Sequence, residues 1–194
     1  MAKTPLRGGP ARQEELLSAA LDVLREVGYG RLTIDAVVAR ARASKTTVYR
    51  RWPSKSALVI AAFTEATKAI PTKPNTGSLR GDLLAILDGL VIELGSFGDV
   101  IAGLVSEVQR NDELAGAVRE TFVRARKQAM VDVLAAARER GEIPADTDVE
   151  LLWHLGPALL FFRMLFLGEQ LDAALVRRVV DGVILPAARA GGRP

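Results

Sequence analysis

The sequence contains no cysteine and only one histidine, His154, among its 194 residues. Without cysteine, the chain can form no disulfide, thiol nucleophile or thiolate metal site. A single histidine cannot supply the paired imidazoles of a common zinc site. These absences exclude most cysteine- and metal-dependent chemistry, and we predict neither a metal nor a cofactor. They also fit a reducing, cytoplasmic setting.

Targeting signals and long apolar runs are also lacking. The N-terminus has no apolar stretch of the kind that a secretory signal requires. The most apolar segment, residues 151–167, is interrupted by His154, Pro157 and Arg163, whereas a membrane-spanning helix needs about 20 mostly apolar residues. We therefore expect a cytoplasmic protein without a membrane partner, in which this segment forms a buried or interface helix.

The motifs of common enzymes are missing as well. The chain has no G-x-x-x-x-G-K-[ST], no G-x-G-x-x-G and no G-x-S-x-G sequence. Asp146, Asp148 and Glu150 resemble the start of a calcium loop, but Leu151 and Pro157 stand where that loop requires glycine and glutamate. We predict no catalytic residues and a protein that is not an enzyme.

The charge that is present is unevenly distributed. Residues 1–55 carry 11 Lys or Arg against 5 Asp or Glu, while residues 56–194 carry 15 against 18. A basic N-terminal part joined to a mildly acidic remainder indicates contact with a polyanion, and nucleic acid is the obvious one. Charge alone leaves a solvated basic face as an equal alternative.

Apolar residues recur at helical spacing almost throughout, and no segment alternates with a period of two. We predict an all-α fold of about nine helices, with Thr33, Ser44 and Ser54 as N-caps. The predicted helices cover residues 11–27, 34–40, 44–51, 54–70, 79–94, 97–109, 112–140, 148–167 and 172–189. Residues 71–78, P-T-K-P-N-T-G-S, have the composition of a linker.

The first three predicted helices have helix-turn-helix organisation, since the second and third are short and closely spaced. The third begins S-K-T-T and continues V-Y-R-R-W, while Ala39, Val48 and Trp52 are expected on the packing side. Hydroxyl, ammonium and guanidinium donors on one short helix suit contacts to base edges and phosphates. An ordinary solvated helix is the alternative.

The stretch Tyr29–Phe63, with its core A-S-K-T-T-V-Y-R-R-W-P-S-K over Ala43–Lys55, resembles the N-terminal DNA-binding domain of the tetracycline-repressor (TetR) family. The resemblance covers about the first 70 residues. The remainder is similar to a C-terminal type of that family that is common in actinobacteria. The family resemblance implies a ligand-responsive regulator, usually a repressor, that binds a palindromic double-stranded DNA operator as a homodimer and is released by a small-molecule effector. A helical DNA-binding or adaptor protein without an effector is the alternative.

The resemblance implies three regions: a helix-turn-helix domain over residues 1–53, a connecting helix over 54–70, and an effector-binding and dimerisation domain over 71–194. Phosphate contacts are implied for Thr33 and Lys55, and major-groove contacts for residues 45–47. The full predicted DNA-binding set is Thr33, Arg42, Ser44, Lys45, Thr46, Thr47, Tyr49, Arg50, Arg51 and Lys55.

Three further features concern the predicted helix-turn-helix domain over residues 1–53, which we call the reading head. Arg42 stands in the turn where the family usually has glycine, so this turn either avoids a left-handed residue or stores strain. Thr46 replaces another frequent glycine, which alters the approach to the groove. The basic tail residues Lys3, Arg7 and Arg12 offer further minor-groove or phosphate contacts.

The resemblance also implies an effector cavity bounded by the middle helices. The candidate lining residues are Phe97, Leu104, Gln109, Phe122, Arg126, Trp153, His154 and Arg163. Arg163, in an apolar helix, requires an anionic partner, either a ligand carboxylate or, as we favour, an internal Asp or Glu. His154 either bonds a ligand or is an internally satisfied histidine, which is the commoner case.

The last two predicted helices carry more apolar surface than one domain of this size can bury, and an isologous two-fold interface would cover it. The predicted interface residues are Leu159, Phe162, Phe166, Leu175, Val176, Val179 and Val183. Packing inside the monomer is the alternative. Gly156 and Pro157 are expected to kink their helix.

Overall fold

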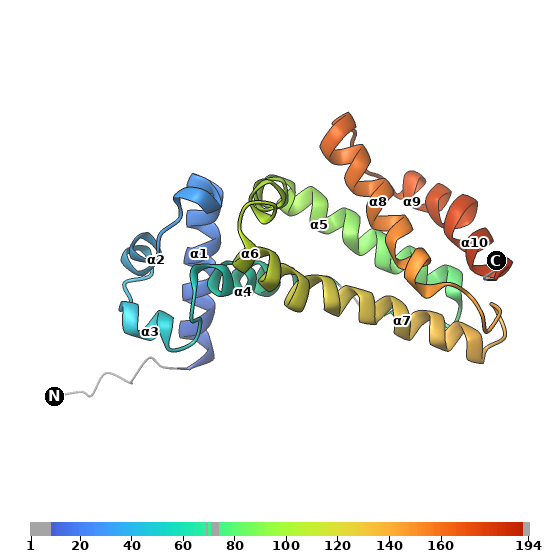
Figure 1. The fold of residues 1–194 in the computed structure, drawn as a ribbon, viewed down its shortest axis with the longest axis horizontal. Coiled ribbons are helices and arrows are strands. Elements are labelled where there is room, and N and C mark those ends of the chain that lie inside the picture. Colours follow the sequence, from blue (N-terminus) through green and yellow to red (C-terminus); the bar gives the residue numbers. More distant parts are fainter. Residues whose placement is uncertain (1–8, 69, 71–73, 192–194) are drawn as a thin grey trace. The chain divides into compact units, whose positions relative to one another are not determined.

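The computed structural model describes residues 9–68, 70 and 74–191, which form two compact units. One unit contains residues 9–68 and 99–122, and the other contains residues 70, 74–98 and 123–191. The described chain has eight continuous helical segments and no strand (Figure 1). The predicted all-α fold is therefore confirmed, with a helix count close to the nine expected.

The first unit begins with α1 (Pro10–Arg31), α2 (Ile34–Arg40), α3 (Lys45–Tyr49) and α4 (Lys55–Thr67). The side-chain oxygens of Thr33, Ser44 and Ser54 each accept from the backbone N–H three residues later, at 3.1–3.2 Å. All three predicted N-caps are confirmed. Such caps matter most for α2 and α3, whose few residues leave much of the backbone without a helical partner.

Two residues with positive φ shape the same unit. Gly28, at φ 74° and ψ 167°, interrupts α1 where the sequence predicted its end, although helical geometry resumes as far as Arg31. Arg42, at φ 49°, lies in the turn between α2 and α3. Its carbonyl accepts from the Arg12 guanidinium at 2.7 Å. Arg42 therefore has left-handed backbone geometry, which is strained for a residue other than glycine. The hydrogen bond from Arg12 of α1 holds the turn in this conformation.

The core of the first unit lies between α1, α2, α3 and α4 and includes the fully buried Leu16, Val37, Val48 and Leu58. Trp52 is buried as predicted. Ala39 is exposed, contrary to prediction, because the buried positions of the seven-residue α2 are Ile34 and Val37.

Residues 99–122, which the resemblance assigned to the effector domain, pack within this first unit. They hold the last part of α5 (Leu79–Val108), then α6 (Asp112–Ala117) and most of η1 (Val118–Val123), a π-helical turn. α6 packs against α4 (Figure 1), and the rings of Phe63 and Phe122 lie 5.3 Å apart. The DNA-binding helices therefore share a core with a segment from far along the chain.

The second unit is built from the first part of α5 with α7 (Arg124–Glu139), α8 (Val149–Leu167), α9 (Ala173–Val179), η2 (Val180–Ile184) and α10 (Leu185–Ala190). The predicted long helix over 112–140 is confirmed as the continuous α6–η1–α7, followed by Gly141 at φ 73°. The two helices predicted over 79–109 are one helix, α5, kinked at Phe97 (φ −134°, ψ 19°).

α8 buries one narrow face, formed by Leu152, Gly156 and Leu160, and runs as an α-helix through Pro157. Among the described residues, it alone is long and apolar enough to cross a membrane by length and composition, at a mean hydropathy of 1.4. Phe162 and Phe166, stacked at 5.4 Å, are 53% and 77% exposed. Within its unit, most of the apolar surface of α8 is uncovered.

Candidate nucleic-acid interface

α3 separates its side chains into a packing face and an exposed polar face. Val48 is fully buried and anchors the helix, whereas Lys45, Thr46, Tyr49 and Arg50 are exposed. Tyr49 is 50% exposed. A large aromatic with a polar tip, held at the surface among cations, has both an apolar face and a hydroxyl to offer a partner.

Lys45 is held across the turn by α2. Its ammonium lies 2.7 Å from the Asp35 carboxylate, and this hydrogen bond raises the pKa of Lys45. Both side chains are more than half exposed, so the pair is accessible to solvent. Sequence reasoning missed Asp35, because nothing local links residues ten apart. A nucleic acid that engages Lys45 must compete with this carboxylate.

The hydroxyls at the start of α3 are partly engaged within the helix. The Ser44 and Thr47 hydroxyls lie 2.8 Å apart, and Ser44 also caps the helix by accepting from the Thr47 N–H. Thr33 is likewise occupied as an acceptor from the Ala36 N–H. Each hydroxyl retains hydrogen-bonding capacity beyond these contacts, since an O–H both donates and accepts.

Lys55 does not extend freely from the start of α4. Its ammonium donates to the Gly30 carbonyl at 3.3 Å and lies 4.3 Å from the centre of the Tyr29 ring. Burial lowers the pKa of Lys55. Tyr29 is 5% exposed, and its hydroxyl lies 2.7 Å from that of Ser56. The sequence identified Lys55 but missed Tyr29, whose position after Gly28 gave no signal.

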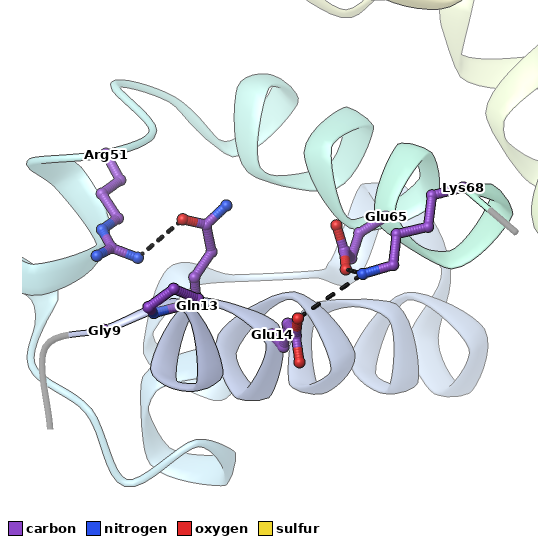
Figure 2. Close-up of a pocket in the computed structure, with 7 residues that line it drawn as sticks. Gly9, Gln13, Glu14, Arg51, Glu65 and Lys68 are labelled. Atoms are coloured by element: carbon purple, nitrogen blue, oxygen red, sulfur yellow. Dashed lines mark hydrogen bonds and ion pairs between the residues drawn. The ribbon is translucent and has the colours of Figure 1, made fainter.

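Arg51 turns towards α1, as Figure 2 shows, and donates to the Gln13 side chain at 3.0 Å. It borders a hollow of about 250 Å³. The lining residues are Gly9, Pro10, Gln13, Glu14, Arg51, Glu65 and Lys68. Lys68 pairs with Glu65 and lies 3.7 Å from Glu14, so its charge is balanced locally (Figure 2). Arg51 thus fastens α3 to α1, while Arg42 and Arg50 remain exposed.

The basic tail is only partly described. Lys3 and Arg7 lie outside the described residues. Arg12 pairs with Glu15 at 2.5 Å in addition to its bond to the Arg42 carbonyl. Its role in the structure is to support the turn that precedes α3.

Two family profiles match the chain. The profile for bacterial regulatory proteins of the tetR family matches residues 16–62, and the tetracyclin repressor-like C-terminal domain matches residues 73–183. Together these cover well over half of the sequence.

The chain belongs to the TetR family.

Known proteins agree with this membership. An HTH-type transcriptional regulator of Mycobacterium tuberculosis is 44% identical over 176 residues, covering 91% of this chain and 87% of that protein. The DNA-binding transcriptional repressor TetR of Mycobacteroides abscessus is 35% identical, covering 95% and 98%. A crystal structure of a TetR-family transcription regulator superposes with a TM-score of 0.75 at 30% identity, covering 94% and 99%. The protein is therefore a helix-turn-helix, DNA-binding transcriptional regulator.

The residues predicted to line a TetR effector cavity are divided between the two units. Leu104, Gln109 and Phe122 belong to the first, where Leu104 is buried and Gln109 is exposed. The other five, Phe97, Arg126, Trp153, His154 and Arg163, belong to the second unit.

Arg126 pairs with Glu93 of α5, which sequence reasoning missed. Glu93 is only 1% exposed, and its Oε1 atom has no hydrogen-bond partner among the described residues. Burial raises the pKa of Glu93 and lowers that of Arg126. The second unit therefore loses free energy of folding through the desolvation of these two charges.

Arg163 and His154 each have a partner nearby in the chain. Arg163 pairs with Glu169, which confirms the internal-anion alternative. His154 is exposed; its Nε2 accepts from the Trp153 indole at 3.0 Å, and its Nδ1 lies 2.5 Å from the Glu150 carbonyl. The described residues contain no group of three or more His, Asp or Glu side chains arranged to hold a metal.

The predicted dimer residues fall into two groups. Leu159, Phe162, Phe166 and Val183 are exposed large apolar side chains, and Leu175 is half-buried. Val176 and Val179 are at most 4% exposed, because their side of α9 faces the interior of the second unit. These two valines therefore belong to the core of one protomer, and the prediction that they contact a partner is wrong. Leu151 and Leu167 add exposed apolar surface that the prediction left out.

Proposed function

We propose that this TetR-family protein is a repressor that binds a palindromic operator as a homodimer and leaves it when a small-molecule effector binds. The observation that carries the proposal is α3, where a buried Val48 fixes a short helix whose exposed residues are Lys45, Thr46, Tyr49 and Arg50. Such a helix fits the major groove, where its donors meet base edges and phosphates. Since its relatives are bacterial regulators, we place it in the cytoplasm, with the DNA.

The uncovered surface of α8 supports the proposed homodimer. Phe162 and Phe166 form a stacked, exposed aromatic pair, with Leu159 and Val183 also exposed. An isologous interface would bury this row against its symmetry mate. Two recognition helices related by a two-fold axis read half-sites about 34–36 Å apart, which is one turn of DNA.

Effector release requires a ligand that prefers the conformation with lower DNA affinity, since equal affinity for both conformations would shift nothing. The segment 99–122 supports a route for such a shift. It belongs by sequence to the C-terminal family domain, yet it packs with α1 and α4. A displacement of this segment would act directly on the DNA-binding helices. The relative in Mycobacteroides abscessus is named as a repressor, and this supports repression rather than activation here.

The test uses a duplex from the promoter of the protein's own gene in gel-shift titrations. We expect Lys45→Ala and Tyr49→Ala each to weaken binding by about tenfold or more, a loss that corresponds to one good base or phosphate contact. Lys127→Ala is the charge-matched control, because Lys127 pairs with Glu150 in the second unit at 2.5 Å. Wild-type affinity in both α3 variants would show that α3 is not the recognition helix.

A further inference from the structure

A buried hydrogen-bonded group in the first unit connects α6 to α4 through α1. The Tyr29 hydroxyl lies 2.7 Å from that of Ser56, which is fully buried on α4. The same hydroxyl accepts from the Asn111 side-chain amide at 3.5 Å. Asn111 is also the N-cap of α6, since its Oδ1 accepts from the Leu114 N–H at 2.9 Å. One side chain therefore starts α6 and contacts Tyr29.

Lys55 uses the face of the same tyrosine ring. Its ammonium lies 4.3 Å from the ring centre and 3.3 Å from the Gly30 carbonyl. The ring face attracts a cation, and the contact strengthens as the cation loses water. Lys55 is also the residue just before Ser56, so two successive residues of α4 contact Tyr29, one at its face and one at its hydroxyl.

Segment 99–122 adds an acidic side chain close to this group. A Cβ atom added to Gly30 would lie 3.3 Å from the Glu107 Oε1 atom. Glu107 opposes the effect of burial on the pKa of Lys55 and works with burial to raise the pKa of Tyr29. The surroundings of Lys55 thus come from α1, which carries Tyr29 and Gly30, and from the segment that carries Asn111.

We propose that Asn111 is a positioning residue for Lys55, acting through the Tyr29 hydroxyl to fix the ring on which the ammonium rests. The inference rests on the proposed operator binding, in which Lys55 contacts a phosphate. A phenol hydroxyl makes its hydrogen bonds close to the plane of its ring, so partners on two sides of the Tyr29 hydroxyl hold the end of the ring in place and favour one ring plane. The position and plane of the ring then determine where the cation lies. The strength of the phosphate contact then depends on where α6 begins, which makes it sensitive to movement of segment 99–122.

The test is a double-mutant cycle on binding to the same promoter duplex. Asn111→Ser keeps a good N-cap residue but is too short to reach Tyr29, whereas Asn111→Ala removes both contacts. Lys55→Met removes the charge and keeps the stem. We expect Asn111→Ser to weaken DNA binding about three- to tenfold in the wild-type background but less than about twofold in Lys55→Met, since residues in one network are not additive. Tyr29→Phe, which keeps the ring and removes the hydroxyl, should behave like Asn111→Ser.

Salt dependence gives a second readout that a structural defect would not move. Lys55→Met should lower the slope of log affinity against log salt by about one, and Asn111→Ser should move the slope in the same direction. Asn111→Ala should match Asn111→Ser in DNA binding but melt at a lower temperature, because it also loses the cap.

Three outcomes would overturn the inference. One is an equal loss from Asn111→Ser in both backgrounds, which would mark a general structural effect. Another is wild-type affinity in Asn111→Ser together with clear weakening by Lys55→Met. The third is a Lys55→Met protein with wild-type affinity and salt slope. Failure of the unaltered protein to bind the duplex would instead refute the proposed function, and this inference with it.

Discussion

At the scale of single residues, the Glu93 carboxylate is a buried acidic group whose hydrogen bonds are incompletely satisfied. It is 1% exposed, it pairs with Arg126, and one of its oxygens accepts no hydrogen bond within the described chain. Arg126 is less confined, with 24% of its side chain exposed. Removing Arg126 should therefore destabilise the fold more than removing Glu93, since an unpaired charge costs more free energy where water cannot reach it.

We predict that Arg126→Met lowers the free energy of unfolding by about 3 kcal/mol and Glu93→Gln by about 1 kcal/mol. The first leaves a buried carboxylate, whereas the second leaves a guanidinium that can turn to solvent. Urea titrations followed by circular dichroism measure both, with Lys127→Met as the neighbouring exposed control. An equal loss of unfolding free energy in Arg126→Met and Glu93→Gln would contradict this prediction.

The same carboxylate predicts a pH effect. Burial raises the pKa of Glu93 above its unfolded value, so the folded protein binds a proton more readily than the unfolded chain. A raised pKa of this kind makes stability rise as the pH falls through the folded pKa towards the unfolded one. In Arg126→Met the opposing cation is gone. Its stability deficit relative to the wild type should therefore shrink as the pH is lowered from 7 to 5, and a deficit that widens would argue against a buried charged Glu93.

At the scale of helices, Gly156 of α8 lies against Leu87 of α5. A Cβ atom there would lie 2.5 Å from a methyl of Leu87, which is itself 1% exposed and has little room to move. We predict that Gly156→Ala lowers the free energy of unfolding by about 1–2 kcal/mol, because overpacking outweighs the better helix propensity of alanine. Gly103→Ala is the control on α5, since nothing lies within 4 Å of its added methyl. Thermal denaturation of both variants tests this prediction. A stabilised Gly156→Ala protein would show that the Leu87 side chain moves aside at little cost.

Helix positions followed from sequence wherever the signal was local. Thr33, Ser44 and Ser54 acted as caps because capping needs only a short polar side chain and the next three residues. The break predicted near residue 96 became a kink at Phe97 inside one helix. Glycines and a serine around this position weaken helix formation locally, but tertiary packing carries the helix through.

The residues of the candidate site also separate into those with a local sequence signal and those that depend on tertiary contacts. The exposed residues of α3 could be named from sequence because they lie on one helix, within a local motif. Asp35, Tyr29 and Glu93 could not, since each acts on a residue that only folding brings near. Val176 and Val179 were misassigned for a related reason: helical spacing identifies an apolar face but does not show whether that face meets the core or a partner.

At the scale of the whole molecule, the exposed aromatic pair on α8 predicts the oligomeric state. We expect Phe162→Asp to convert a dimer into a monomer at micromolar concentration, because a charge at the centre of an apolar interface cannot be solvated. Ile92→Asp is the matched control, with its side chain 56% exposed against 53% for Phe162. Light scattering after size exclusion measures the mass of each. A Phe162→Asp protein that stays dimeric would place the interface elsewhere.

The sharing of one core by residues 9–68 and 99–122 has a consequence for engineering. A reading head cut after α4 would lose α6 and the Phe122 ring, leaving apolar side chains such as Phe63 without their cover. Chimaeric regulators that graft this head onto another sensor at the linker would inherit the same defect. The transferable module is therefore discontinuous in sequence, and a functional graft has to carry residues 99–122 along with the first four helices.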